Sequence, residues 1–350
     1  MAGTERESRD LTEAVRVFGD AAADRPARGL FVLGSPRSGT SWLATIFDAH
    51  PDVLYLHEPD IAHRRDDIPY CQDPPYGTEQ IAAMQHYVAT LFDDRSLRTV
   101  GRREQFDKSY RGRLGQLTRK ALIYAGKGLD HAGRQIGRRA ALPVPDLWRG
   151  GAAPDLTVIK SVTALGRIGL LRAARPDLPI VLIIRHPCGH IASVRRGIEK
   201  GNLEEQKGLG QLANLQVARE FGMAGDNFAA LPLEHKQAVR WAVANSHALR
   251  HLGPGKGAYV MRYEDLCEDP EATIRRLFEQ LGLSLAAPVR RYISESISPV
   301  RADHGYFSTN RDPQKAAWGW RSELPPALTA RIHALVGETD AGRLYGADAW

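Results

Sequence analysis

The sequence predicts an α/β protein of three layers, with a central, mostly parallel sheet and helical insertions. The first observation is a series of short aliphatic runs: Leu30–Leu33, Val53–Leu56, Thr157–Ile159, Ile180–Ile184 and Ala258–Met261. Runs of this kind are typical of strands that are buried on both faces of a parallel sheet. The second observation is that segments of helical period separate the runs. Strands that alternate with helices favour right-handed crossovers that place helices against the sheet.

Two of the intervening helices have clear boundaries. One spans Thr40–Ala49 and ends before Pro51, a residue that cannot continue a helix. The other has Asp269 as its N-cap, Pro270 at its first position and Gly282 just past its end. Its apolar stripe consists of Ile274, Leu277, Phe278 and Leu281.

Composition and length favour one elaborated domain. The chain has 350 residues, 43% hydrophobic and 25% charged, which is enough to bury a sizeable core. No Pro-, Ser- or Gly-rich linker separates two cores, so we expect a single domain over 29–350 with insertions at about 60–155 and 197–237. Residues 1–28 form a polar leader whose composition is typical of disorder.

Several features indicate a cytoplasmic protein. The leader lacks the apolar region of a secretory signal, and no stretch approaches the roughly 18 apolar residues of a membrane span. The three cysteines, Cys71, Cys188 and Cys267, are odd in number and lack metal-ligand spacing. We therefore expect a reducing compartment, no integral membrane contact and no metal.

The charge distribution fits an anionic ligand. The net charge is +6, too modest to indicate a nucleic-acid binder by itself. From Arg95 to Arg139 there are 13 Lys or Arg residues against 3 Asp or Glu residues. This run is either a solvated helix face or a patch for an acidic partner.

A loop that could hold a phosphate or sulfate follows the first predicted strand. Gly34 and Gly39 frame the sequence G-S-P-R-S-G, and a helix follows, which is the arrangement of a P-loop-like fold. The backbone N–H groups and the helix N-terminus of such a loop bind anions. Walker A would require Lys after Gly39, but Thr40 stands there and Arg37 is the loop's cation. No predicted strand ends in an Asp for Mg²⁺, so a magnesium-dependent kinase is disfavoured; a turn without a ligand is the alternative.

Polar residues also follow the other predicted strands. Ile184 is followed by Arg185-His186-Pro187, with Ser193 further along a predicted helix. The guanidinium fork of Arg185 suits a phosphate monoester, although a structural Arg would fit the same position. Ligands of open parallel sheets bind beyond the carboxyl ends of the strands, where these residues would converge.

These two motifs carry a family resemblance. G-x-x-R-S-G-T-S-W at Gly34–Trp42 and R-H-P-x-x-x-x-x-S at Arg185–Ser193 resemble the 5′-phosphosulfate loop and the 3′-phosphate motif of sulfotransferases that use 3′-phosphoadenosine 5′-phosphosulfate (PAPS). Arg37–Pro59 is most similar to the carbohydrate sulfotransferase branch, and Met261–Leu266 is also similar to the family. The resemblance implies sulfuryl transfer from PAPS, with adenosine 3′,5′-bisphosphate (PAP) as product.

The resemblance also implies roles for single residues. The 5′-phosphosulfate would be bound by Gly34, Arg37, Ser38, Gly39, Thr40 and Ser41. Arg185 and Ser193 would bind the 3′-phosphate, and Trp42 would contact adenine unless it is a core residue. Lys315 and Arg321 lie in an irregular segment that resembles a loop closing over the nucleotide.

A base is needed for an acceptor hydroxyl, and Glu58 is the candidate. It follows the second predicted strand at a place where similar enzymes carry a catalytic Glu, and Arg37 would stabilise the departing phosphate. His57 and His186 are rival bases, or Glu58 pairs structurally with Arg37 or Lys160. Lys160, which ends a third strand with Ser161, orients a substrate or forms an ion pair.

The acceptor is open at this level. A sugar hydroxyl is favoured by the branch resemblance alone, and a glycolipid, a peptide or a small-molecule natural product is an alternative acceptor, sulfated on oxygen or nitrogen. The oligomeric state is also open. Rival functions are a P-loop small-molecule kinase, a non-catalytic protein that binds PAP or PAPS, and a nucleic-acid protein that relies on the basic run.

Overall fold

The structure is a computed structural model. It describes residues 29–102, 106–135, 143–144, 153–204, 210–223, 228, 230–253, 257–298 and 312–350. The expected leader, residues 1–28, lies outside the described residues.

One sheet of five parallel strands forms the centre, in the order β2-β3-β1-β4-β5. The strands are β1 (Gly29–Leu33), β2 (Val53–His57), β3 (Leu156–Ser161), β4 (Ile180–Ile184) and β5 (Ala258–Arg262). Each of the five predicted runs is a strand, so this prediction is confirmed. In the register, Leu33 lies opposite Ser161, His57 opposite Lys160, and Ile184 opposite Arg262. The carboxyl ends of all five strands therefore meet at one edge of the sheet.

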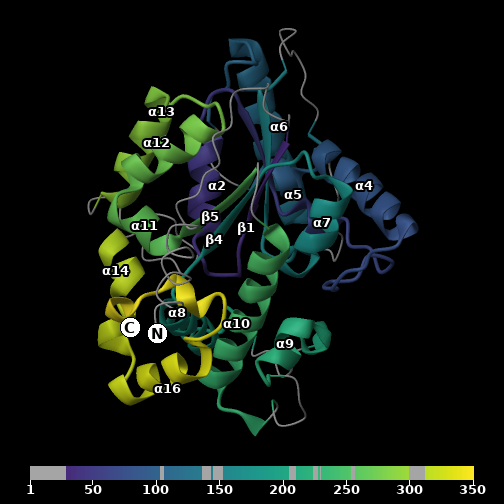
Figure 1. Ribbon diagram of the computed structural model, residues 1–350. Coiled ribbons are helices and arrows are strands. Elements are labelled where there is room, and N and C mark those ends of the chain that lie inside the picture. Colours follow the sequence, from purple (N-terminus) through teal and green to yellow (C-terminus); the bar gives the residue numbers. More distant parts are fainter. Residues whose placement is uncertain are drawn as a thin grey trace.

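Helices cover both faces of the sheet, which confirms the three-layer prediction (Figure 1). One face packs against α2 (Thr40–Asp48), α11 (Tyr263–Glu268), α12 (Pro270–Gln280) and α13 (Ala287–Ile297). The other packs against α4 (Thr78–Asp93), α7 (Ile168–Ala174), α8 (Pro187–Glu199) and α10 (Leu233–Leu252). Successive residues of β1 enter opposite cores, Leu30 and Val32 on the α2 side and Phe31 and Leu33 on the α4 side. Because residues on both faces contribute to the two cores, the strands are largely apolar, and their polar residues, such as Lys160 and Ser161, gather at the carboxyl ends.

The two predicted helices have the expected ends. α2 ends one residue before the predicted boundary. At the start of α12, the Asp269 carboxylate accepts the Ala272 N–H at 3.0 Å, and Pro270 stands in the first turn. Gly282, just past the end, has a φ of 69°, the left-handed conformation that closes helices.

Further short elements fill the segments expected to be insertions and the C-terminal part. The first insertion contains α3 (Pro59–Ala62), α5 (Leu97–Val100) and α6 (Arg113–Gln135), and the second contains η2 (Gly210–Asn214) and α9 (Gln216–Glu220). After β3 comes η1 (Leu165–Arg167), and the C-terminal part contains α14 (Pro313–Trp318), α15 (Trp320–Glu323), α16 (Pro326–Val336), η5 (Gly342–Leu344) and η6 (Ala347–Ala349).

The prediction of an irregular segment around Lys315 and Arg321 was wrong, because these residues lie in α14 and α15. The Asp312 carboxylate accepts the N–H groups of Gln314 and Lys315 at 3.0 and 3.2 Å, and Pro313 begins the helix. A capped start of this kind favours helix even though a glycine follows shortly afterwards.

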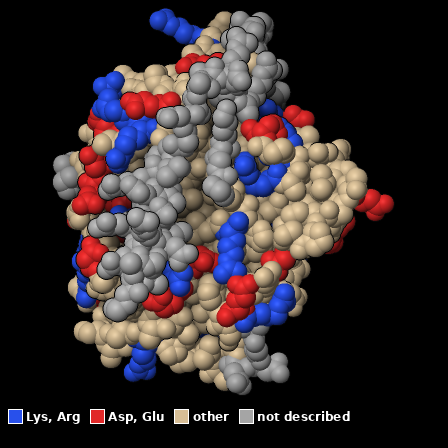
Figure 2. Space-filling view, viewed as in Figure 1, with Lys and Arg blue, Asp and Glu red and all other residues tan. Residues whose placement is uncertain are grey.

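The basic run is only partly a surface feature. Lys108, Arg111 and Arg119 are buried, and the Lys108 ammonium lies 2.9 Å from the Asp48 carboxylate in α2. Neither of the two sequence interpretations, a solvated face or an acidic-partner patch, accounts for these three buried cations. On the face shown in Figure 2, basic and acidic residues are interspersed. None of the helices in the described ranges combines the length and apolar composition that a bilayer span requires.

Candidate active site

The loop between β1 and α2 needs glycine at both ends. A Cβ on Gly34 would lie 2.6 Å from the Ile183 carbonyl oxygen and 2.7 Å from the Thr40 methyl group. Gly39 has a φ of 90°, and a Cβ there would overlap the ring of Tyr263. The loop is therefore held closely between β4 and the start of α11, which only glycine permits at these two positions.

The interior of the loop offers donors that an anion could use. Ser38 is fully buried, and its hydroxyl makes no hydrogen bond. Thr40 is buried and Ser41 half-buried in the first turn of α2. Because the first N–H groups of a helix have no acceptor within the helix, this end of α2 suits a phosphate or sulfate group.

Arg37 links the two predicted phosphate motifs. Its backbone is left-handed, with a φ of 71°, and its Nε donates to the Ser193 hydroxyl of α8 at 3.1 Å. Arg185, at the end of β4, donates to the Arg37 carbonyl oxygen at 3.0 Å, and the Arg185 Nε is buried without a hydrogen bond. The predicted convergence of Arg185 and Ser193 is therefore confirmed, and it occurs through Arg37.

Arg185 also contacts the C-terminal part of the chain. Its guanidinium donates to the Ala316 carbonyl of α14 and lies 4.9 Å from the centre of the Tyr263 ring. Lys315, the neighbour of Ala316, is exposed on α14. This contact places α14 beside the loop, and the nucleotide role of Lys315 stays a prediction.

Arg321 and Trp42 both have structural partners. The Arg321 guanidinium donates to the carbonyl oxygens of Asp348 and Ala349 at 3.0 and 3.2 Å and lies 4.4 Å from the centre of the Trp318 ring. Trp42 is buried in the core on the α2 side, and its indole N–H donates to the Ser296 hydroxyl at 2.9 Å. Their predicted contacts with the nucleotide stay predictions.

Glu58 and Lys160 form an ion pair at the sheet edge. Glu58 directly follows β2 with a left-handed φ of 47°, and its N–H donates to the Lys160 carbonyl at 2.9 Å. The Lys160 ammonium donates to Glu58 Oε1, and Glu58 Oε2 lies 3.6 Å from His57 Nε2. The sequence allowed Arg37 or Lys160 as a structural partner of Glu58, and the structure pairs it with Lys160. The Glu58 side chain keeps 18% of its surface exposed, so it is only partly buried.

The two rival bases are placed very differently. His57 is buried, and its Nδ1 lies 2.6 Å from the Tyr55 hydroxyl, next to Glu58. His186 is fully buried and stacks on Trp320 with 4.7 Å between ring centres. Burial, followed by the charges of Arg321 and Arg185, lowers the pKa of His186 to about 3. The rings of Tyr345 and Trp350 also lie against His186. A substrate hydroxyl would have to displace these aromatic rings to reach His186, which makes His186 the weaker rival.

Asp60 is a site residue that the sequence analysis did not identify. It is buried in α3, and its Oδ2 accepts hydrogen bonds from the hydroxyls of Ser161, at 2.6 Å, and Thr163. Its Oδ1 is buried and has no hydrogen-bond partner. Asp60 also lines a small, apolar cavity together with Tyr87 and Arg167. Its position two residues after Glu58 was the signal in the sequence.

Glu264 is the second residue that was missed. It is buried at the start of α11, where it accepts the His186 N–H at 3.0 Å and lies 3.1 Å from the Tyr345 hydroxyl. Burial raises the pKa of Glu264 to about 6. The carboxyl group therefore connects the end of β4 to the C-terminal part; the sequence showed it only as part of a family-like stretch.

Acid is expected to destabilise the fold through His186 and His190. Burial is the main cause that lowers the pKa of each from 6.5 to about 3. The stability contributed by the neutral rings is present above pH 6.5 and is lost as the pH falls toward the folded pKa, by between about 1 and 2 kcal/mol per ring at pH 5.5. Glu264, with its raised pKa, acts in the opposite direction and offsets about 1 kcal/mol.

The net loss for these three groups is about 2 kcal/mol between pH 7.5 and 5.5, measurable by urea unfolding at both pH values. In the His190→Asn variant the loss between the two pH values should shrink by about half or more. Equal unfolding free energies for the wild-type chain at the two pH values would contradict the assignment.

Comparison with known proteins identifies the family. The model of the sulfotransferase family matches residues 29–287. Carbohydrate sulfotransferase 5 of Mus musculus is 24% identical over 341 residues, 88% of this chain and 78% of that protein. Carbohydrate sulfotransferase 1 of Danio rerio is 25% identical over 318 residues, 84% of this chain and 72% of that protein.

Solved structures of sulfotransferases are also similar. One from Alicyclobacillus acidocaldarius is 15% identical with a TM-score of 0.42, covering 92% of this chain and 95% of that one. A mouse sulfotransferase in complex with PAP is 13% identical with a TM-score of 0.40, covering 95% of this chain and 91% of that one. Because the family model covers well over half of the chain, including both phosphate motifs and Glu58, this protein belongs to the sulfotransferase family.

Proposed function

We propose that this protein transfers a sulfuryl group from PAPS to a carbohydrate hydroxyl, with Glu58 as general base. The observation that carries the proposal is the meeting of two arrangements at one edge of the sheet. One is the anion loop with its Arg37–Ser193 and Arg185–Arg37 hydrogen bonds, and the other is the Glu58–Lys160 pair. The first suits a donor with separate phosphate groups, and the second supplies a carboxylate beside it.

The donor would be bound by the residues of the two motifs. Ser38, Thr40, Ser41 and the loop backbone would hold the 5′-phosphosulfate, while Arg185 and Ser193 would hold the 3′-phosphate. The buried hydroxyl of Ser38 and the buried Nε of Arg185 both lack hydrogen bonds, and buried polar atoms of this kind usually have a partner. An anionic ligand would satisfy both.

The transfer step needs a base and a cation. As the acceptor oxygen forms its bond to sulfur, its proton passes to the Glu58 carboxylate, and the bond between sulfur and the bridging phosphate oxygen breaks. The charge that develops on the departing phosphate is stabilised by the Arg37 guanidinium, which stays protonated. Lys160 is a positioning residue, since its ammonium holds Glu58 Oε1 and leaves Oε2 for the acceptor.

The acceptor class is inferred from the relatives. The two curated relatives are named as carbohydrate sulfotransferases. A glycolipid or a natural product that carries a hydroxyl fits the same chemistry. We also propose a cytoplasmic location, supported by three cysteines that are all free and buried.

Titration calorimetry on metal-free protein tests the donor before any acceptor is known. We expect PAP to bind at least about 100-fold more tightly than 5′-AMP, because 5′-AMP lacks the 3′-phosphate that Arg185 and Ser193 would bind; hydrogen bonds to charged groups contribute roughly 1.5–3 kcal/mol each. Preference for ATP with Mg²⁺ would favour a kinase instead. PAP binding without turnover of labelled PAPS on any sugar, lipid or peptide hydroxyl would favour a non-catalytic binder.

Arg321→Ala is expected to raise the apparent KM for PAPS by up to about fivefold. This is the change in affinity that corresponds to losing one exposed charge interaction. The reason is that Arg321 supports the α14–α15 segment that contacts Arg185. The matched control is Arg331→Ala, an exposed arginine of α16. If the variant has a lower melting temperature but an unchanged apparent KM for PAPS, Arg321 only stabilises the C-terminal residues whose carbonyls it binds.

A further inference from the structure

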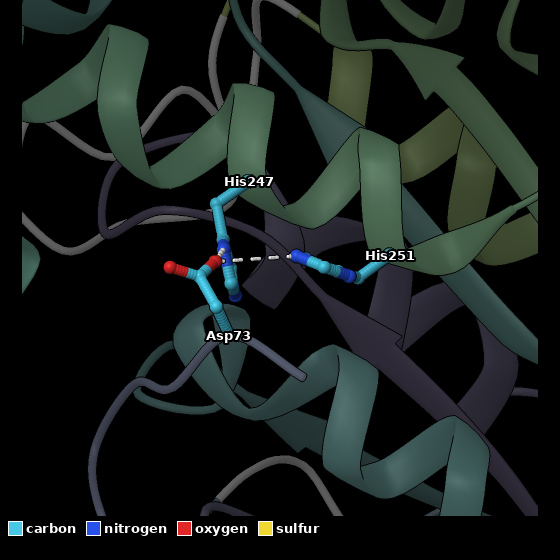
Figure 3. A group of neighbouring side chains, drawn as sticks. All are labelled: Asp73, His247 and His251. Atoms are coloured by element: carbon cyan, nitrogen blue, oxygen red, sulfur yellow. Dashed lines mark ion pairs between the residues drawn. The ribbon is translucent and has the colours of Figure 1, made fainter. Parts of the chain in front are cut away.

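Three ligand-type side chains lie together outside the site described above (Figure 3). Asp73 comes from the loop before α4, and His247 and His251 come from α10. The Asp73 Oδ1 lies 3.4 Å from His247 Nδ1 and 3.5 Å from His251 Nε2. The ligand atoms of all three residues lie within 4.8 Å of one another. Residues four apart on a helix share a face, so α10 presents both rings to the same carboxylate.

The hydrogen bond of His247 decides which ring nitrogen faces Asp73 with a lone pair. His247 Nε2 lies 3.1 Å from the Gly166 carbonyl oxygen, which can only accept, so Nε2 carries a proton. In the neutral ring, Nδ1 then carries a lone pair and lies 3.4 Å from a carboxylate oxygen. This Nδ1 is buried and makes no hydrogen bond, and the His247 side chain is fully buried. A cation between the two acceptors, either a metal ion or a second proton on the ring, would satisfy both of them.

Two of the three distances match those between neighbouring ligands of a tetrahedral metal ion. Bonds of about 2.1 Å from zinc to histidine nitrogen and carboxylate oxygen place neighbouring ligand atoms about 3.4 Å apart. The two separations that involve Asp73 have this value. The Gly166 carbonyl bound to His247 is also the usual outer partner of a metal-bound histidine.

We infer that Asp73, His247 and His251 bind one divalent transition-metal ion of the zinc class. Two imidazoles and one carboxylate favour such an ion over Mg²⁺ and Ca²⁺, which prefer oxygen ligands. No metal was expected from the sequence, because the three cysteines lack metal-ligand spacing and no predicted strand ends in an Asp; Asp73 and His247 were not considered, since they are far apart in the chain.

The ion would join separate segments of the fold. Asp73 belongs to the first insertion, and its Oδ2 accepts the backbone N–H of Gln216, at the start of α9 in the second insertion, at 2.6 Å. α10 itself reaches the anion loop, where Asn245 lies 3.2 Å from the Ser35 hydroxyl. The metal therefore has a structural role, holding both insertions against the helix that supports the loop.

Zinc titration of the full chain, freed of any histidine tag and stripped with a chelator, tests the site. We expect one equivalent of Zn²⁺ to bind and the melting temperature to rise by about 5 °C at a free concentration about 100 times Kd. His251→Gln should weaken zinc binding at least about 100-fold. Removing a residue that only hydrogen-bonds to a metal ligand would lower the metal affinity less than this. His86→Gln, at an exposed position on α4, is the matched control and should bind zinc like the wild-type chain.

Two further measurements make the result decisive. Co²⁺ added to the wild-type chain should give the intense visible absorption of a tetrahedral nitrogen–oxygen site. This measurement does not require that any variant folds. PAP affinity of the folded His251→Gln variant should equal that of the wild type, which separates this inference from the proposed function. No stoichiometric zinc binding, or zinc binding unchanged in His251→Gln, would show that the three side chains form only an ion-paired cluster and would overturn the inference.

Discussion

Replacing Glu58 with glutamine is expected to lower kcat by about 10²- to 10⁴-fold, the usual contribution of a general base, and to leave the Kd for PAP within about twofold. Glutamine keeps the size of the side chain and can still accept a hydrogen bond from the Lys160 ammonium. It cannot take the acceptor proton. The measurement is turnover of labelled PAPS with carbohydrate acceptors, alongside calorimetric titration with PAP.

The controls separate chemistry from structure. Glu268→Gln changes an exposed carboxylate of α11 and should leave turnover unchanged. Lys160→Met should lower kcat less than Glu58→Gln and alter the pH profile of kcat, because the carboxylate loses the cation that holds it. If Glu58→Gln retains wild-type turnover, Glu58 is not the base and its pairing with Lys160 is structural, which leaves His57 as the nearest rival.

Replacing Arg185 with alanine is expected to weaken PAP binding by about 10- to 150-fold, the effect of losing hydrogen bonds from a charged donor to an anion. The fork of Arg185 stands at the end of β4, and its Nε is buried without a partner. The affinity for 5′-AMP, which has no 3′-phosphate, should fall much less. Calorimetric titration of both nucleotides measures the difference.

Arg185 also holds the Arg37 and Ala316 carbonyls, so the alanine variant could lose stability as well as affinity. Ser193→Ala removes a buried hydroxyl that also accepts the Arg37 Nε hydrogen bond, and it should weaken PAP binding in the same direction, by about tenfold. Arg276→Ala, at an exposed position of α12, controls for the loss of one positive charge. Arg185→Ala and Ser193→Ala variants that fold and bind PAP like the wild-type chain would remove the 3′-phosphate role from both residues.

The strands and the anion loop could be predicted because their signals are local. Each apolar run is buried on both sides of the sheet, so composition alone marks a strand such as Ile180–Ile184. The glycines at 34 and 39 and the capping Asp269 act on their immediate neighbours. The helix α14 was missed because its start depends on a single carboxylate, Asp312, within a sequence otherwise typical of loops.

The site was predicted only in part. Arg37, Glu58, Lys160, Arg185 and Ser193 could be named because each follows a strand or lies in a motif. Their pairing could not, since contacts such as Arg37 with Ser193 join residues 156 positions apart. Asp60 and Glu264 were missed for the same reason: one stands near Glu58 and the other lies in a family-like stretch, but the sequence does not show which distant groups contact their carboxylates.

The sequence by itself determined the layered α/β architecture, the anion loop and the family-like motifs, because strand burial, glycine conformation and helix capping depend on neighbouring residues. The tertiary structure alone decided that Lys160 pairs with Glu58 and that Arg37 links the two phosphate motifs. It alone also brought Asp73 to the two histidines of α10. These contacts depend on strand order and helix packing, which place side chains together whatever their separation along the chain.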